Sequence, residues 1–286
     1  MNSSGKTQLS TTDPDSRSVI FQRTSVKVGY NIQAASDAKH KLLIAADTGD
    51  VNDTKALSPV AKQVQCNLKK KKMNVIADKG YHSGRELRAC HESGMTTFVS
   101  PKQSSSSKKK PAFASTSFKY NQSKDEYLCP AGETLKTNGR SYNKKLKDGK
   151  KSYHVKHYKT KACKKCSLRN QCTSNKNGRT IERTEYAEDI ERNNKCVNKN
   201  PEYYRLRQQI IEHQFGTLKR QWGYDHTHMR GKHKVLGETY LVFTAYNLKR
   251  SIQIVGFDQL LKQLKANIRF VLKMLMLHSL SAIQIK

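Results

Sequence analysis

The chain has 286 residues, enough for one sizeable domain or for a domain that carries an insertion. Lysine and arginine total 54 against 23 aspartate and glutamate residues, which gives a formal net charge of +31 at pH 7. No run of about 18 apolar residues occurs and the first residues are polar, so we expect neither a transmembrane helix nor a secretory signal.

The excess of positive charge indicates an anionic partner, because a charge of this size repels itself in the folded state unless something screens it. Nucleic acid is the first candidate, since phosphates attract lysine and arginine whatever the sequence. A lysine-rich soluble surface is the alternative. The seven cysteines, in a chain without a signal, are expected as thiols or metal ligands of a reducing compartment, which predicts a cytoplasmic, nucleoid-associated protein.

Residues 1–100 are predicted to form the first part of an α/β domain. After a polar segment, residues 1–24, that we expect to be loop, alternating and apolar runs predict strands at residues 29–38, 41–49, 73–78 and 95–101. Helical spacing of apolar residues predicts helices at residues 53–72 and 83–94, the second with Ser83 as its N-cap. This order of strands and helices is typical of an α/β layer.

Three further regions follow. Residues 101–180 start with a low-complexity stretch, contain short segments rich in tyrosine and lysine, and are expected to be an inserted, loop-rich subdomain. Residues 181–255 are expected to complete the domain with helices, one of them opened by Pro201. Residues 256–286 are expected to be a helical tail packed on the domain, with a helix on a membrane surface as the alternative.

Two carboxylates stand out as candidate site residues. Asp78 follows the apolar run of a predicted strand, and residues at the carboxyl ends of strands in such sheets face the ligand crevice. The cap and turn at this point are open to other residues, Ser83 and Lys79. Glu212 lies beside the apolar face of a predicted helix, where burial would raise its pKa unless a metal ion or a cation pairs with it. A shared metal site and a surface salt bridge both remain open from the residues alone.

The cysteines and histidines supply a second set of candidate ligands. Cys163 and Cys166 form a C-x₂-C pair, with Cys172 six residues later and Cys129 upstream, which is enough in principle for a tetrahedral zinc site. The histidines in GYDHTHMRGKHK, residues 223–234, are more simply explained by a basic loop near the DNA backbone than by metal binding. Trp222 is expected to fill the core rather than to stack on a base.

Five segments, taken in order, resemble successive blocks of the DDE transposases of insertion sequences, in the group whose catalytic domain carries an inserted segment. They are GYNIQAASDAKHKLLIAADTGDVNDTKAL, VIADKGYHSGRELRACHESGMTTFVSP, YLCPAGETL, CKKCSLRNQCT and IIEHQFGTLKRQWGYDHTHMRGKHKVLGETYLVFTAYNLKR. Together the blocks cover roughly residues 13–255. The resemblance implies an α/β fold of the ribonuclease-H type: a mixed sheet with flanking helices, interrupted by the insertion.

The resemblance also implies a catalytic site. Three carboxylates would hold two Mg²⁺ (or Mn²⁺) ions, which clamp the attacking and leaving oxygens of a DNA phosphodiester during cleavage and strand transfer. Asp78 matches the second acidic residue of the family and Glu212 the third, while Lys219 matches a lysine that meets phosphate. Gln214 replaces a family proline, and Gln208 replaces a family arginine whose role could pass to Arg207.

Partners follow from the same resemblance. The expected partners are DNA, as element ends and target, and a second copy of the chain in a homodimer, with no membrane. The candidate DNA-binding residues are Lys219, Arg207, Lys79, Arg220 and Arg230. The four cysteines Cys129, Cys163, Cys166 and Cys172 occupy family positions, which adds support for a structural Zn²⁺.

The chain departs from the family at its first catalytic aspartate, which has no match here. Asp13, Asp15 and Asp37 are acidic but lie at other positions, and Asp37 is the least unsuitable substitute. We therefore expect an N-terminally truncated copy that is defective in catalysis. The alternative function is that of a non-catalytic, basic remnant that binds nucleic acid.

Overall fold

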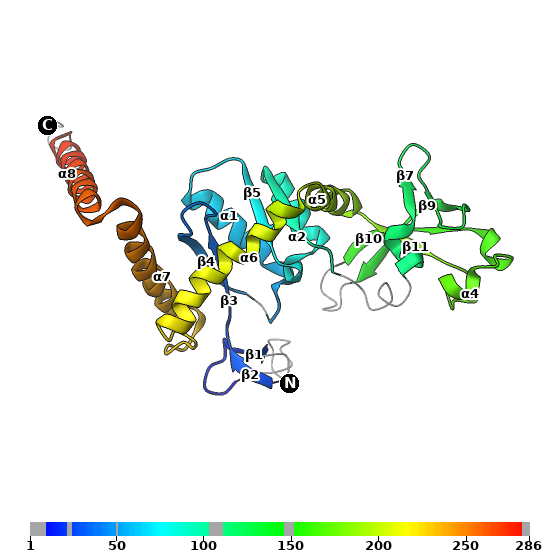
Figure 1. Cartoon of the computed structure of the whole chain (residues 1–286), viewed down its shortest axis with the longest axis horizontal. Helices are drawn as coiled ribbons and strands as arrows, with labels where there is room; N and C mark the ends of the chain where they lie inside the picture. Colours follow the sequence, from blue (N-terminus) through cyan, green and yellow to red (C-terminus); the bar gives the residue numbers. More distant parts are fainter. Residues whose placement is uncertain (1–9, 22–24, 50, 103–110, 146–151, 282–286) are drawn as a thin grey trace. The chain divides into compact units, whose positions relative to one another are not determined.

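The structure is a computed structural model that describes residues 10–21, 25–49, 51–102, 111–145 and 152–281. The low-complexity stretch at residues 103–110 lies outside these ranges. The chain forms two compact units, the first made of Met1–Lys71 with Arg205–Lys286 and the second of Lys72–Tyr204. Each unit combines helices and strands (Figure 1), which confirms the predicted α/β class.

The strands of the first unit form two antiparallel pairs. One pair joins β1 (Arg17–Phe21) to β2 (Ser25–Gly29), and the other joins β3 (Asn31–Ser36) to β4 (Leu43–Gly49). The prediction of loop up to residue 24 was therefore wrong at β1. Its short apolar run follows a long polar segment, and its partner β2 exposes Val26 and Val28, so β2 lacks the alternating burial that marks many strands.

Helices complete the first unit. They are α1 (Leu57–Asn67), α6 (Pro201–Gly216), which starts in the second unit, α7 (Lys232–Val255) and α8 (Phe257–Ser281). The core joins Leu43 and Ala46 of β4 to Leu218, Phe243 and Tyr246, with Trp222 packed against it. The expectation that Trp222 fills the core is confirmed.

Polar side chains of α7 fasten it to β4. The Asn247 amide donates to the carbonyl of Leu43 at 2.7 Å and accepts from the Leu43 N–H at 2.8 Å. The Tyr240 hydroxyl donates to the Ala46 carbonyl at 2.8 Å. These bonds satisfy backbone groups of β4 that its strand partner leaves open, which fixes the position of α7 along the strand.

The tail is helical, as predicted, but its expected packing is not found. From Phe257 to Arg269, where side chains are described, only Leu260 is half-buried and the others are exposed. Among the residues that the structure describes, no helix is both long and apolar enough to cross a membrane.

The second unit begins with a strand, helix and strand. Strands β5 (Met73–Ala77) and β6 (Met95–Val99) are parallel, with Met73 opposite Met95, and α2 (Gly84–Glu92) connects them. Helix α5 (Ala187–Lys199) packs on α2 and β6. The buried Asn193 of α5 donates to the Val99 carbonyl at 2.7 Å and accepts from its N–H at 2.9 Å.

Residues 119–184 contain a five-stranded antiparallel sheet, in the order β11–β10–β9–β8–β7, whose last strand lies beyond the predicted insertion of residues 101–180. Its strands are β7 (Lys119–Asn121), β8 (Glu126–Leu128), β9 (Thr134–Lys145), β10 (Ser152–Lys159) and β11 (Ile181–Thr184). This is more regular structure than the loop-rich subdomain that we predicted. Lysines on the exposed face hid the strand pattern, while Tyr127, Tyr158 and other aromatic and aliphatic side chains form a core on the opposite face.

The ribonuclease-H arrangement requires one mixed sheet. The antiparallel pair β3–β4 belongs to the first unit and the parallel pair β5–β6 to the second. A single sheet that contains all four strands, and the four predicted domains with their boundaries, therefore stay predictions.

Candidate active site

Asp78 lies directly after β5, as the sequence predicted, and is exposed. It is the N-cap of a 3₁₀ turn, Lys79–Tyr81, and its Oδ1 accepts a hydrogen bond from the Lys79 N–H at 2.6 Å. Our expectation that other residues supply the cap and the turn was wrong: Ser83, at the start of α2, makes no side-chain cap bond. Asp78 thus has a structural role in addition to any catalytic one.

Glu212 lies on α6 and is exposed, so it is not buried against the apolar face of the helix. The neighbouring buried position is Gln214, whose amide donates to the Lys41 carbonyl at 3.2 Å in the turn between β3 and β4. A proline at this position, as in the family, would remove a helical hydrogen bond and kink the helix. Gln214 therefore lets α6 continue to Gly216 and anchors it to the β3–β4 turn.

The helix widens after Gly216 into a π-helical turn, Thr217–Gln221, marked by the bond from the Trp222 N–H to the Thr217 carbonyl at 3.0 Å. Lys219 and Arg220 lie in this turn and are exposed, and the Lys219 ammonium lies 5.4 Å from the ring centre of Phe215. A wider turn changes the angle between Glu212 and Lys219 from that of a regular helix, and such turns are frequent at functional sites.

The remaining basic candidates are spread over the chain. Arg207 is half-buried on α6, Lys79 is exposed in the turn after Asp78, and Arg230 is exposed before α7. Asp78 and Lys79 belong to the second unit and Glu212 to the first. The approach of Asp78 to Glu212 therefore stays a prediction. Within the described ranges, no group of three or more His, Cys, Asp or Glu side chains is arranged to hold a metal ion.

The acids that we weighed as a first catalytic aspartate have structural partners. The Asp37 carboxylate accepts hydrogen bonds from the N–H groups of His40 at 2.7 Å and Leu42 at 3.0 Å, which hold the turn between β3 and β4. Asp13 accepts from the Tyr30 hydroxyl at 2.8 Å. Burial, together with Asp13, raises the pKa of Tyr30 to about 12.

The four cysteines of the inserted segment line one pocket, together with apolar residues of the sheet core. All seven cysteines of the chain are free thiols, and Cys129 accepts a hydrogen bond on its sulfur from the Glu133 N–H at 3.3 Å. The pKa of the Cys172 thiol is raised, mainly by burial. The other three thiols also raise it, whereas the positive charge of Arg179 lowers it. Zinc binding at this pocket stays a prediction.

Close packing supports the pocket. Gly178 has a φ of +85°, and a Cβ at this position would lie 2.6 Å from the Cβ of Cys163. Only glycine allows the chain to pass this close to the C-x₂-C turn.

The rings of His226 and His228, in the loop before α7, lie 4.8 Å apart, but among the described residues they are part of no group of three metal-ligating side chains. His226 lies 2.6 Å from the carboxylate of Asp225, and the backbone N–H of His228 donates to Glu238. The basic loop near the DNA backbone stays a prediction.

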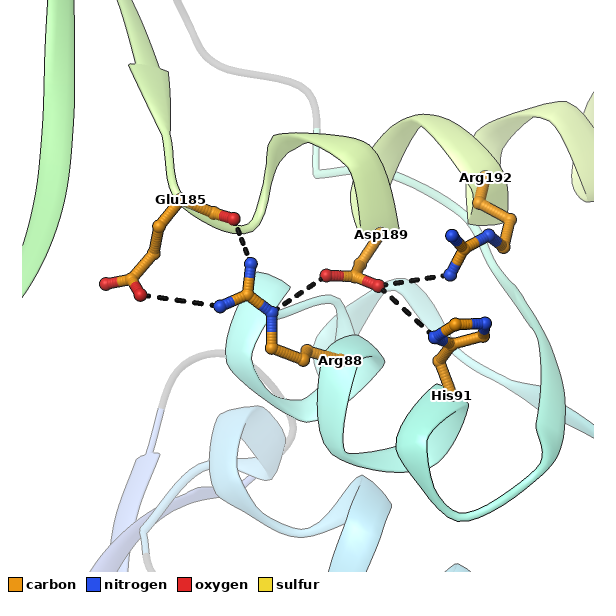
Figure 2. A network of polar contacts seen from close by, with 5 residues as sticks. All are labelled: Arg88, His91, Glu185, Asp189 and Arg192. Carbon is orange, nitrogen blue, oxygen red and sulfur yellow. Dashed lines mark hydrogen bonds and ion pairs between the residues drawn. The ribbon is translucent and has the colours of Figure 1, made fainter.

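Sequence reasoning missed a polar network that joins α2 to α5 (Figure 2). The Arg88 Nε donates to Asp189 at 2.9 Å, and Arg192 and His91 approach the same carboxylate at 3.2 Å and 3.7 Å. Glu185 contacts the other end of the Arg88 guanidinium. The i,i+3 spacing of Asp189 and Arg192 was visible in the sequence, but the partner on α2 was not.

Glycine makes this contact between helices possible. A Cβ on Gly84, at the start of α2, would lie 2.6 Å from the Cβ of Tyr186, which lies just before α5. The network and this close approach fix α2 against α5, which is a structural role.

The geometry therefore defines a strongly basic α/β protein with two exposed candidate carboxylates and a cysteine pocket. Residues 128–252 match the family model described as a transposase DDE domain. This match confirms the predicted resemblance to the insertion-sequence DDE transposases. It includes Glu212, Lys219 and the four cysteines, covers less than half of the chain and leaves Asp78 outside. Neither the curated proteins nor the solved structures gave a match.

Proposed function

We propose that the chain acts on DNA in transposition, by metal-dependent cleavage and strand transfer of phosphodiesters, with Asp78 and Glu212 as ligands of Mg²⁺ or Mn²⁺. The observation that carries the proposal is the match to a transposase DDE domain over a span that contains Glu212. A transposase acts on DNA, and the net charge of +31 supports such a partner. Element ends, target DNA, a homodimer and association with the nucleoid are part of the proposal.

The two carboxylates suit a hard cation, since Mg²⁺ prefers oxygen ligands and keeps several waters. Both are exposed, so they can exchange water for a metal ion and substrate without unfolding. When bound, the metal would polarise the phosphodiester and activate the attacking hydroxyl. The bond from the Lys79 N–H orients Asp78, and Lys219 and Arg220 hold the phosphates beside Glu212.

A DNA cleavage assay tests this proposal. Labelled element ends with Mg²⁺ or Mn²⁺ should be cut by an active chain, and Asp78→Asn or Glu212→Gln should lower the rate by at least about 10²-fold, a loss that corresponds to about 2.7 kcal/mol of barrier. Glu92→Gln, an exposed glutamate at the end of α2, is the matched control and should keep full activity. Equal rates for all three variants would remove both residues from the mechanism.

The second candidate function is nucleic-acid binding without catalysis. Of the three acids that the family resemblance implies, two have matches in this sequence, and Asp37 is held by its own turn. In this second candidate function, the 286-residue chain binds DNA but neither cuts nor joins it alone. Turnover by the purified chain, abolished by Asp78→Asn, would show that another acid completes the site and would contradict this proposal.

A structural Zn²⁺ in the cysteine pocket is the third part of the proposal. Four thiols that line one pocket have the donor chemistry of a tetrahedral zinc site, but among the described residues no three of them are arranged around one point, so metal binding would have to draw them together. Protein purified without chelator should contain about one zinc per chain. Cys163→Ser should lose the metal, whereas Cys66→Ser, an exposed cysteine of α1, should retain it. An absence of zinc in the unmodified protein would exclude the site.

A further inference from the structure

The first unit has a pocket of its own. It lies between the end of α6, with its π-turn, and the second half of α7. Its volume is about 200 Å³. All of its lining residues carry polar side chains, and none is acidic: His213, Thr217, Gln221, Tyr246, Lys249, Arg250 and Gln253. Glu212 is not among them. Two facing helices usually bury apolar side chains between them, so a wholly polar lining needs another explanation.

The spacing of these residues shows how the pocket arises. His213, Thr217 and Gln221 recur every four residues along α6 and the π-turn, so they follow one face. Lys249, Arg250 and Gln253 follow Tyr246 at three, four and seven residues, which is again one helical face. The two polar faces meet where the His213 Nδ1 lies 3.1 Å from the buried Tyr246 hydroxyl.

The pocket is electrostatically positive. Lys249 and Arg250 line it, and the guanidinium is anchored by the bond from its Nε to the His40 carbonyl at 3.0 Å. Hydroxyl and amide groups of Thr217, Gln221 and Gln253 add neutral hydrogen-bond donors.

We propose that this pocket binds a phosphate group of a nucleic-acid backbone, with Lys249 and Arg250 as its charged partners. Ammonium and guanidinium groups with nearby amide and hydroxyl donors are the usual contacts of phosphate oxygens. The choice of DNA as the source of the phosphate rests on the proposed function. The binding of a phosphate group by the pocket does not rest on the proposed function, and it would also be expected of a chain that binds DNA without cutting it.

The chain contains its own reporter for this site. Trp222 is the only tryptophan, and the Lys249 ammonium lies 5.7 Å from the centre of its ring. A phosphate that draws Lys249 toward the pocket changes the surroundings of the indole. Inorganic phosphate should therefore produce a saturable change in tryptophan fluorescence of the full chain, and equal ionic strength of chloride should not.

Variants distinguish phosphate binding at the pocket from the general attraction of DNA to a positively charged chain. Gln253→Leu removes a donor from the lining and leaves Lys249 beside Trp222, so the fluorescence change should remain but require several-fold more phosphate. Lys249→Gln should lower DNA affinity several-fold and reduce the slope of log K against log salt by about 1. Lys234→Gln, an exposed lysine at the start of the same helix, is the matched control and should change the slope less.

The outcomes discriminate clearly. No saturable change with phosphate, or equal losses of DNA binding in Lys249→Gln and Lys234→Gln, would overturn the proposal. Phosphate binding with an unaltered DNA slope in Lys249→Gln would overturn the assignment to nucleic acid. Failure of the chain to cut DNA would contradict the proposed catalysis but leave the fluorescence and slope results standing, so the two failures are distinguishable.

Discussion

The five-stranded sheet of the second unit and the α6–α7 region of the first unit use polar side chains differently. In the sheet, Asp125 accepts hydrogen bonds from Tyr120 at 2.7 Å, Tyr158 at 2.6 Å and Lys156 at 3.0 Å. In the α6–α7 region, Lys249 and Arg250 line a pocket without an acidic side chain. Polar groups that satisfy one another stabilise a fold. Uncompensated charge of one sign costs stability, and its presence indicates a ligand of the opposite charge.

The largest expected effect of a single change is in the sheet core. Tyr158 is fully buried and packs between Tyr120 and Tyr127. Tyr158→Ala should lower the free energy of unfolding by about 3–5 kcal/mol, because it leaves a large cavity. Tyr158→Phe keeps the ring and should cost about 1 kcal/mol for the lost bond to Asp125. Urea unfolding measures both, and equal losses would show that packing is not the main term.

The network between α2 and α5 should give the next largest effect. Asp189 is nearly buried and meets three cationic or titratable side chains. Asp189→Ala should destabilise the chain by about 2–3 kcal/mol, because Arg88 loses its shorter ion pair and keeps only Glu185 as a charged partner. Arg192→Ala removes a half-exposed ion pair and should cost less than about 1 kcal/mol. An equal cost for both, in urea unfolding, would contradict the central place of Asp189.

Asp125 should make the sheet sensitive to acid. The pKa of Asp125 is lowered from 3.8 to about 2. The hydrogen bond from Tyr158 is the largest cause, followed by the one from Tyr120. A lowered pKa contributes stability that is present above the unfolded value and lost as pH falls through the folded one. Stability should therefore drop between about pH 4 and pH 2, and Asp125→Asn should lack this step. If Asp125→Asn loses as much stability between about pH 4 and pH 2 as the unmodified chain, other carboxylates cause the acid sensitivity.

The smallest effect on stability is expected in the α6–α7 pocket. Lys249→Gln relieves repulsion with Arg250 but loses the contact with Trp222, so its unfolding free energy should change by less than about 0.5 kcal/mol. Thermal unfolding of this variant and of the unmodified chain provides the comparison. A large loss of stability would mean that Lys249 is structural, as Asp125 is.

The sequence predicted the order of strands and helices from β3 to β6 and the long helices after residue 185. These elements have strong periodicity or clear caps, so local rules suffice. The sheet of the inserted segment was missed because its strands are stabilised by contacts distant in sequence, such as that of Asp125 with Tyr158. The exposure of the first half of α8, residues 257–269, was missed because an amphipathic pattern shows which face is apolar but not whether anything covers it.

The candidate site was predictable in part. The strand end at Asp78 could be read from the apolar run before it, but its role as a turn cap depends on the backbone geometry of a single residue. The exposure of Glu212 was missed because Gln214, rather than the glutamate, occupies the buried position beside the β3–β4 turn. The polar pocket was not recognised, because its two faces lie on different helices and each alone resembles a solvated surface.

The most direct test of the account is whether Asp78 and Glu212 bind one metal centre, whatever the activity of the chain. Fe²⁺ in place of Mg²⁺, with ascorbate and hydrogen peroxide, generates radicals that cut the polypeptide next to the bound ion, and mass spectrometry locates the cuts. We predict cuts near both residues, protection by excess Mg²⁺, and loss of both cuts in Asp78→Asn and in Glu212→Gln but not in Glu92→Gln. Cuts near one residue only, or cuts that persist in both variants, would contradict a shared site.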